Sequence, residues 1–183
     1  MKGIFSVATF LALASALVSG APLKQRWTYT VPANNLWIVT NPAPVAILPQ
    51  PTSGAAEVSI SNGSGEIDTV VSFDMSGYPA PTSESTCQFF IQNVTPTGSG
   101  IVQLFTLGGE ATSFPTPIIP FYNQYEGQYN VNTSPSTPID VQYVPCKFLE
   151  DGAFQFVIRP QNTDDYLSWA QTGTVGAFIQ YNP

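Results

Sequence analysis

The sequence contains no histidine. A Ser-His-Asp triad and a Cys-His pair both need an imidazole as the general base, so the chain holds neither. The same absence excludes zinc and copper sites that depend on imidazole ligands. Carboxylates, hydroxyls and carbonyl oxygens are the groups that remain for chemistry.

Charged side chains are also scarce. They make up 9% of the chain, with five Lys and Arg against twelve Asp and Glu and a net charge of −7; an average protein has about 25%. An acidic surface without a basic patch repels nucleic acid and anionic lipid, so we expect neither nucleic acid nor a membrane as a partner. Aromatic residues make up 13% and can bury enough apolar area for a folded core.

Long apolar runs are absent except at the start of the chain, over residues 4–18. This run follows the short basic segment Met1-Lys2-Gly3 and is shorter than the roughly 20 residues that span a bilayer. We therefore expect a signal peptide over residues 1–20 and a single domain over residues 21–183. The closing segment "GAFIQYNP" has no tail for a lipid anchor. The expected product is secreted and is extracellular or located in the cell wall.

Only two cysteines are present, Cys87 and Cys146. An even number in a secreted chain favours a disulfide, and a reactive thiol would need a base that this chain lacks. The bond would close a loop of about 60 residues and contribute on the order of 4 kcal/mol in the chain-entropy model.

Short alternating segments between Pro and Gly turns fill most of the chain, and no long stretch has a 3.6-residue period. Residues 66–75, 87–92 and 154–158 each place apolar side chains at alternate positions along one face, and Val70 is an exception on the other face of the first segment. The fold class predicted is all-β, a single antiparallel β-sandwich with one disulfide and at most a short helical turn, over residues 163–171. The turn "TPTGSG" between residues 87–93 and 101–107 predicts a hairpin.

The order of these segments from about Val58 onward resembles a secreted fungal family, the But-type C-terminal domain of ubiquitin-three-binding proteins. The resemblance rests on "STCQFFIQN", "TGSG", "IVQLFTL", "VPCKF", "FQFVIRP" and "NTDDYLSWAQ" before "GAFIQY". It implies an extracellular β-sandwich with one disulfide and supplies no catalytic residues. Ubiquitin binding is not carried over, because a secreted protein does not meet cytosolic modifiers.

The segment "FYNQYEGQY" interleaves Tyr122, Tyr125 and Tyr129 with amide side chains. Flat rings stack on the apolar face of a sugar while amides bind its hydroxyls, so these tyrosines are candidate glycan-binding residues. The alternative is that two of the rings fill the core and the rest cover an edge of the sandwich. We expect a non-enzymatic protein with a glycan- or surface-binding role, whose partner is cell-wall polysaccharide or another extracellular surface.

The alternative function is a glycoside hydrolase that uses a carboxylate pair. Such a pair needs a separation of about 5 Å or roughly 6.5–9.5 Å, which only the fold can create. The adjacent pairs Glu150/Asp151 and Asp164/Asp165 are better explained as turn residues. No catalytic residue is assigned from the sequence.

Oxygen-bearing side chains alternate after one turn, at Asn62, Ser64, Glu66 and Asp68. This spacing vaguely suits calcium but does not match the EF-hand loop. No metal site and no cofactor are therefore predicted.

Three N-glycosylation sequons are present, at Asn62, Asn93 and Asn132. Pro96 and Pro135 directly follow the second and third sequons and hinder the acceptor conformation, so Asn62 is expected to be used first. Glycans would keep this weakly charged surface soluble.

The disulfide prediction is tested by alkylating the denatured, unreduced mature protein. Neither Cys87 nor Cys146 is expected to be labelled, because both sulfurs are in one bond, and reduction should expose both. Labelling of both before reduction, or Cα atoms more than about 7 Å apart, would contradict it.

Overall fold

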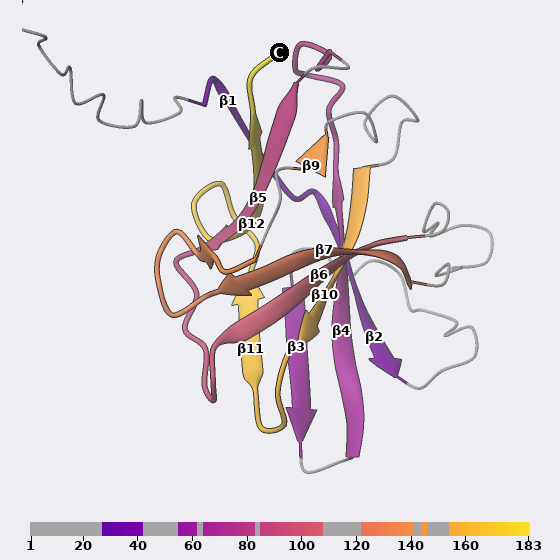
Figure 1. Cartoon of the computed structure of the whole chain (residues 1–183), viewed down its shortest axis with the longest axis vertical. Coiled ribbons are helices and arrows are strands. Elements are labelled where there is room, and N and C mark those ends of the chain that lie inside the picture. Colours follow the sequence, from indigo (N-terminus) through magenta and orange to yellow (C-terminus); the bar gives the residue numbers. More distant parts are fainter. Residues whose placement is uncertain are drawn as a thin grey trace, which may run out of the picture.

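The computed structural model describes residues 27–41, 55–61, 64–82, 85–107, 122–140, 144–145 and 154–183 (Figure 1). Strands and turns account for these ranges, none of which is helical, and the strand pairs are antiparallel. The prediction of an all-β antiparallel fold is therefore confirmed. The expected signal peptide over 1–20, Asn62, Cys146 and the pair Glu150/Asp151 lie outside the described residues. In the described ranges no helix is long and apolar enough to cross a membrane.

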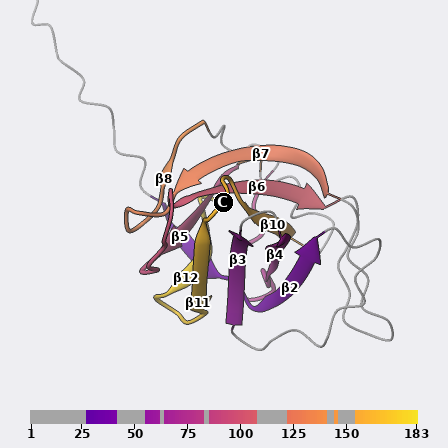
Figure 2. The same ribbon diagram turned by 90° about the horizontal axis from the view of Figure 1, so that it is seen from below.

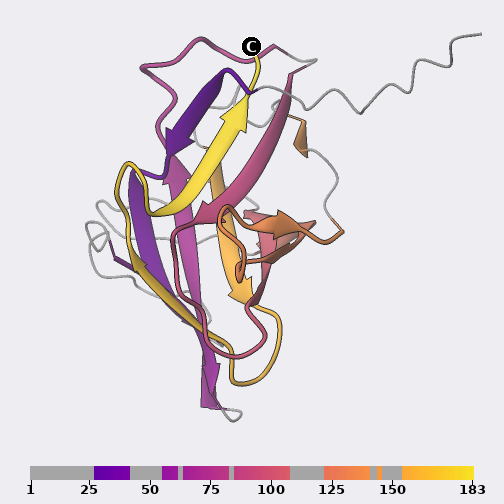
Figure 3. The ribbon, with the colours of Figure 1, turned by 90° about the vertical axis from the view of Figure 1, so that its left-hand side faces the viewer.

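The smaller sheet has four strands and is drawn with β1 in indigo, β5 in magenta and β12 in yellow in Figure 3. Its order is β1 (Tyr29–Pro32), β12 (Gly176–Tyr181), β5 (Thr86–Gln92) and β9 (Val144–Pro145). The last strand of the chain thus lies at the centre of this sheet, between β1 and β5.

The larger sheet has eight strands and curls into a half-barrel, with β6 and β7 arching over the others in Figure 2. Its order is β11 (Tyr166–Ala170), β3 (Ala55–Ser61), β4 (Ser64–Phe73), β10 (Phe154–Pro160), β6 (Ile101–Leu107), β7 (Tyr122–Asn130) and β8 (Thr137–Pro138), with β2 (Asn35–Asn41) on β4.

Strand β4 is the branch point of this sheet, because it pairs with three other strands. Its pairing with β2 runs from Ser72 to Glu66 and overlaps both of its other pairings. A strand has only two edges, so β10 and β3 share the remaining one in succession.

The Thr69 hydroxyl lies where β10 and β3 separate. Its Oγ1 accepts a hydrogen bond from the Glu57 backbone N–H at 3.0 Å and donates one to the Glu57 carbonyl at 2.6 Å. Both backbone groups of Glu57 are thereby satisfied by a buried side chain where the ladder opens. Because these two side-chain bonds take the place of strand-to-strand bonds, the sheet can curl without leaving buried polar groups unpaired.

One apolar core lies between the two sheets. Phe89 of β5 packs against Phe156 of β10 with ring centroids 6.1 Å apart, and Phe154 contacts Phe156 edge-on at 4.7 Å. The predicted inward residues of both strands are buried here: Cys87, Phe89, Ile91, Phe154, Phe156 and Ile158. The alternation seen in the sequence therefore identifies the core faces of β5 and β10.

The predicted hairpin between residues 87–93 and 101–107 is wrong. Strand β5 belongs to the small sheet and β6 to the large one, so the intervening turn carries the chain between sheets. Asn93 and Gly98 on this path have φ of 56° and 80°, in the left-handed region. Two alternating segments joined by a glycine turn have the same sequence pattern whether they pair as a hairpin or lie in different sheets.

The predicted helical turn over 163–171 is also wrong. Residues 166–170 form β11, in which Leu167 and Trp169 are buried while their neighbours are exposed. This is a period of two, which a helix cannot give. Trp169 lies so close to Gly176 of the last strand that a Cβ at this glycine would come within 2.5 Å of the indole. Asp164 and Asp165 lie in the preceding turn, as predicted.

The buried carboxylate of Asp165 fastens two turns together. It accepts hydrogen bonds from the Ser99 backbone N–H at 2.5 Å, the Ser99 hydroxyl at 2.8 Å and the Asn162 backbone N–H at 3.0 Å. Asp164 beside it is exposed and has a φ of 71°.

Asp165→Ala is expected to lower the free energy of unfolding by roughly 2–4 kcal/mol, because the N–H groups of Ser99 and Asn162 lose their acceptor. Urea denaturation measures the change. Asp164→Asn is the matched control and should change stability little, since Asn tolerates the left-handed region. An equal loss of unfolding free energy in the two variants would contradict the proposal that the Asp165 carboxylate holds the two turns together.

Candidate functional site

The outer face of the large sheet carries a second apolar cluster. It contains Trp37, Val39, Val70 and Val157, with Phe105, Leu107 and Tyr122 packed against them. Val70 is apolar at a position where the alternation of β4 calls for a polar residue, and this cluster is the reason. Both faces of the large sheet therefore bury apolar side chains.

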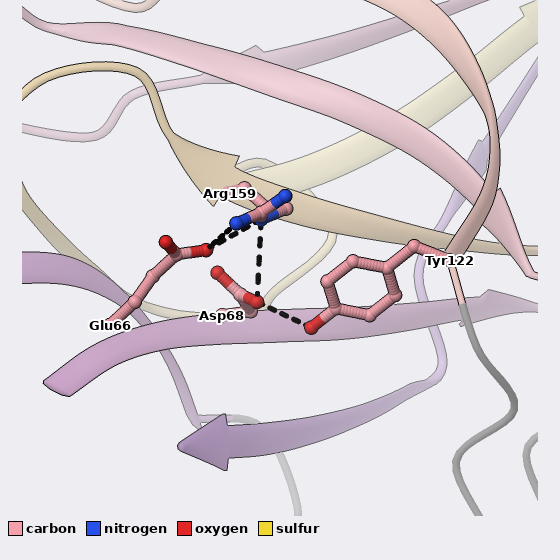
Figure 4. A network of polar contacts seen from close by, with 4 residues as sticks. All are labelled: Glu66, Asp68, Tyr122 and Arg159. Atoms are coloured by element: carbon pink, nitrogen blue, oxygen red, sulfur yellow. Dashed lines mark hydrogen bonds and ion pairs between the residues drawn. The ribbon is translucent and has the colours of Figure 1, made fainter. Parts of the chain in front are cut away.

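Four polar side chains meet beside this cluster: Glu66, Asp68, Tyr122 and Arg159 (Figure 4). Glu66 and Asp68 share one face of β4 because they are two residues apart. Arg159 of β10 donates from Nε to Glu66 Oε1 at 2.5 Å, and its Nη2 contacts the same oxygen. Asp68 Oδ2 lies 3.6 Å from Arg159 Nε and accepts a hydrogen bond from the Tyr122 hydroxyl.

The Arg159 guanidinium lies close to two aromatic rings. Its Cζ is 5.4 Å from the ring centroid of Phe105 and 5.2 Å from that of Tyr122, within the range of a cation–π contact. The two rings are themselves stacked, with centroids 6.2 Å apart. The cation is thus held by carboxylates and aromatic rings together.

Burial raises the pKa of the Asp68 carboxyl to about 8, and the neighbouring Glu66 carboxyl adds to the rise. The Tyr122 hydroxyl and Arg159 act in the opposite direction. Burial and the Asp68 carboxyl also raise the pKa of Tyr122. One positive charge faces two carboxyls here, so the neutral form of Asp68 balances the cluster.

Glu66 and Asp68 form the carboxyl pair that the fold brings together at this cluster. Asp68 has no solvent-accessible surface, so it cannot touch a substrate in this conformation. Both carboxyls are engaged by Arg159, which also argues against their use as calcium ligands. The arrangement ties β4 and β10 to β7 and is best explained as a structural contact.

The three candidate tyrosines do not form one surface. Tyr122 is half-buried in the polar cluster, and Tyr125 is 41% exposed with its hydroxyl donating to Asp140 Oδ2 at 2.8 Å. Tyr129 is 0% exposed and packs edge-on against Phe89 at 5.2 Å in the core. A sugar at the surface can therefore reach Tyr125 but not Tyr129.

Bulges in β7 separate these tyrosines. The register against β6 shifts twice, between Leu104 and Phe105 and again between Phe105 and Leu107. Gly127, with φ of 134°, lies at the first shift, and the side chains before and after it face opposite sides of the sheet. The glycine in "QYEGQY" is the sequence signal for this bulge, which the alternation of side chains alone does not predict.

A hollow of about 340 Å³ opens on the outer face of the small sheet. Its lining consists of Thr30, Gln88, Phe90, Gln92, Pro135, Ser136 and Gln180. None of these side chains carries a charge, and three of them are primary amides. The site combines hydrogen-bonding groups with an aromatic ring and a proline.

Strands β5 and β12 form the floor of this hollow. Cα register places Gln88 opposite Gln180 and Phe90 opposite Phe178. Gln180 Nε2 donates to Gln88 Oε1 at 2.8 Å, and the two phenyl rings stack at 5.3 Å with an interplanar angle of 16°. The outward positions of Gln88 and Gln92, which the sequence predicts, are confirmed.

The wall of the hollow comes from the segment between β7 and β8. The Ser136 backbone N–H donates to the Ile91 carbonyl at 2.6 Å, and the Ile91 N–H donates to Ser136 Oγ at 2.9 Å. These bonds attach Pro135 and Ser136 to the edge of β5. No local sequence pattern predicts this wall, because it lies more than 40 residues from β5 in the chain.

Two of the sequon asparagines are described, and both are exposed. Asn132 donates from Nδ2 to the Ser99 carbonyl at 2.8 Å, and Asn93 donates from Nδ2 to the Thr174 carbonyl at 2.7 Å.

No protein-family model fits the chain, and no curated protein matches its sequence. The chemistry of the hollow and of the polar cluster is therefore the ground for a functional proposal.

The Asp68 carboxyl is expected to make stability depend on pH. Its pKa is raised from 3.8 to about 8 in the folded protein, so folding favours the protonated form. The free energy of unfolding should fall, by at most a few kcal/mol, as pH rises from about 4 towards 8. Asp68→Asn is neutral at every pH and should flatten this slope in urea titrations.

Asp74→Asn is the control for that measurement. Asp74 is exposed, and the Ser76 backbone N–H lowers its pKa, so its charge does not change in this range. Glu126, whose pKa burial also raises, is present in both variants. An unchanged slope in Asp68→Asn would show that Asp68 is ionised in the folded protein.

Proposed function

We propose that this protein is a secreted, non-enzymatic β-sandwich domain that binds neutral polysaccharide at an extracellular surface such as a cell wall. The observation that carries the proposal is the uncharged, amide-lined hollow over β5 and β12. Its volume of about 340 Å³ falls in the range of small-ligand sites, roughly 300–1,000 Å³.

The chemistry of the hollow suits a sugar without charge. The amides of Gln88, Gln92 and Gln180 can each donate to and accept from hydroxyl groups. Phe90 is only 6% exposed, so it offers part of one ring as an apolar contact. Among the described residues that line the hollow, there is no Lys or Arg to neutralise an acidic sugar.

Secretion is supported by the leader-like segment over residues 1–20 and by the resemblance to the But-type secreted domains. The sandwich is supported by the common core of the two sheets. The disulfide is supported by strand register: Cys87 is buried and lies opposite Val144, and β9 ends at Pro145, one residue before Cys146.

The glycoside hydrolase alternative has weaker support. The pair that it would use on this face is Glu66 and Asp68, and Asp68 has no accessible surface. Arg159 would also have to release both carboxyls before either could act.

The proposal is tested by co-sedimentation with insoluble cellulose, chitin and β-1,3-glucan. The protein should be retained by at least one of them without releasing reducing sugar. Gln88→Ala and Gln180→Ala should each weaken retention about tenfold, the equivalent of one hydrogen bond.

The chain offers a matched control pair of amides. Gln128 Nε2 donates to Gln161 Oε1 at 2.9 Å, outside the hollow, so Gln161→Ala removes a similar bond and should leave retention unchanged. Retention by none of the polysaccharides, or an equal loss in Gln161→Ala, would refute the proposal.

A further inference from the structure

The sequon Asn93-Val94-Thr95 directly follows Gln92, one of the residues that line the hollow. We infer that an N-glycan on Asn93 extends over the hollow and competes with external polysaccharide, so that glycosylation regulates binding. The inference rests on the proposed polysaccharide-binding function and adds a modification that controls it.

Asn93 is connected to the floor of the hollow through Thr174. The Thr174 carbonyl accepts hydrogen bonds from Gln92 Nε2 at 3.3 Å and from Asn93 Nδ2 at 2.7 Å. The two amide nitrogens therefore share one acceptor atom. Because Gln92 lines the hollow, a sugar attached to Asn93 Nδ2 begins beside that lining.

Asn93 is also connected to the wall of the hollow. Its backbone N–H donates to Ser134 Oγ at 2.9 Å, and Ser134 Oγ donates to Asn93 Oδ1 at 2.8 Å. Ser134 directly precedes Pro135 and Ser136, which form the wall. These bonds fix the side-chain amide between the floor and the wall.

The modification is chemically compatible with this geometry, although Pro96 after the sequon makes the expected occupancy of Asn93 lower than that of Asn62. Glycosylation joins Asn93 Nδ2 to C1 of an N-acetylglucosamine and breaks the bond from C1 to the diphosphate of a lipid-linked oligosaccharide. The Nδ2 proton that is lost leaves with the released diphosphate. Nδ2 carries two hydrogens, so the one that remains can still donate to Thr174.

Attachment beside the hollow gives the glycan an advantage over any free ligand. A tethered group has an effective concentration of about millimolar or more when its tether spans the distance to the site. N-acetylglucosamine is uncharged and presents hydroxyls, an amide and a methyl group, which match the amides and Phe90. A glycan at Asn132 is not expected to act in this way, because Asn132 Nδ2 donates to the Ser99 carbonyl and not to an acceptor that it shares with a described residue of the lining.

The test compares wild-type protein with Thr95→Ala and Thr95→Val, all secreted from a eukaryotic host. Thr95 is exposed, so both substitutions remove the sequon while leaving Asn93 and its hydrogen bonds in place. Peptide mapping measures occupancy of Asn93, and co-sedimentation with chitin, cellulose and β-1,3-glucan measures binding. Both variants should bind about tenfold more tightly than the occupied wild type.

Asn132→Gln removes the neighbouring sequon and is expected to leave binding at the wild-type level. Equal binding by occupied wild type and both Thr95 variants would overturn the inference alone, as would an unoccupied Asn93 in the secreted protein. Absence of binding in every form would overturn the proposed function and this inference with it.

Discussion

The structure depends on β4, which is paired along both edges and buried on both faces. Three strands take their register from it, and the Thr69 hydroxyl supplies the hydrogen bonds where β10 and β3 separate. Each backbone group left without a partner there would cost about 1–3 kcal/mol. The curl of the large sheet is therefore made possible by one side chain at the branch point.

The two faces of β4 carry different side chains: one face is mostly apolar, and the other combines apolar and charged residues. Val71 and Phe73 point into the core shared with the small sheet. On the other face, Val70 belongs to the second apolar cluster and Asp68 to the polar cluster beside it. Asp68 is tolerated because Arg159 and Tyr122 contact it and because its raised pKa favours the neutral carboxyl. In a chain with so few charges, the described ion pairs are concentrated at this one cluster.

The small sheet differs, since the described side chains that line the hollow on its outer face are all uncharged. Gln88 and Gln180 bond to each other across the strands, and Ser136 attaches the wall to β5. The Asn93 sequon lies where this wall meets the floor. The hollow and the sequon are thus connected through the same loop residues.

The sequence by itself determined the all-β class and the inward faces of β5 and β10, because alternation with period two is a local property of strands. It also identified the outward Gln88 and Gln92. Tertiary structure alone decided which strands pair: β5 and β6 are adjacent in sequence but lie in different sheets. It also decided that Tyr129 is buried while Tyr125 is exposed, through a bulge at Gly127. The hollow and the Glu66–Arg159 cluster depend on residues from distant segments, whose proximity no local pattern encodes, because side-chain periodicity fixes a face but not the strand beside it.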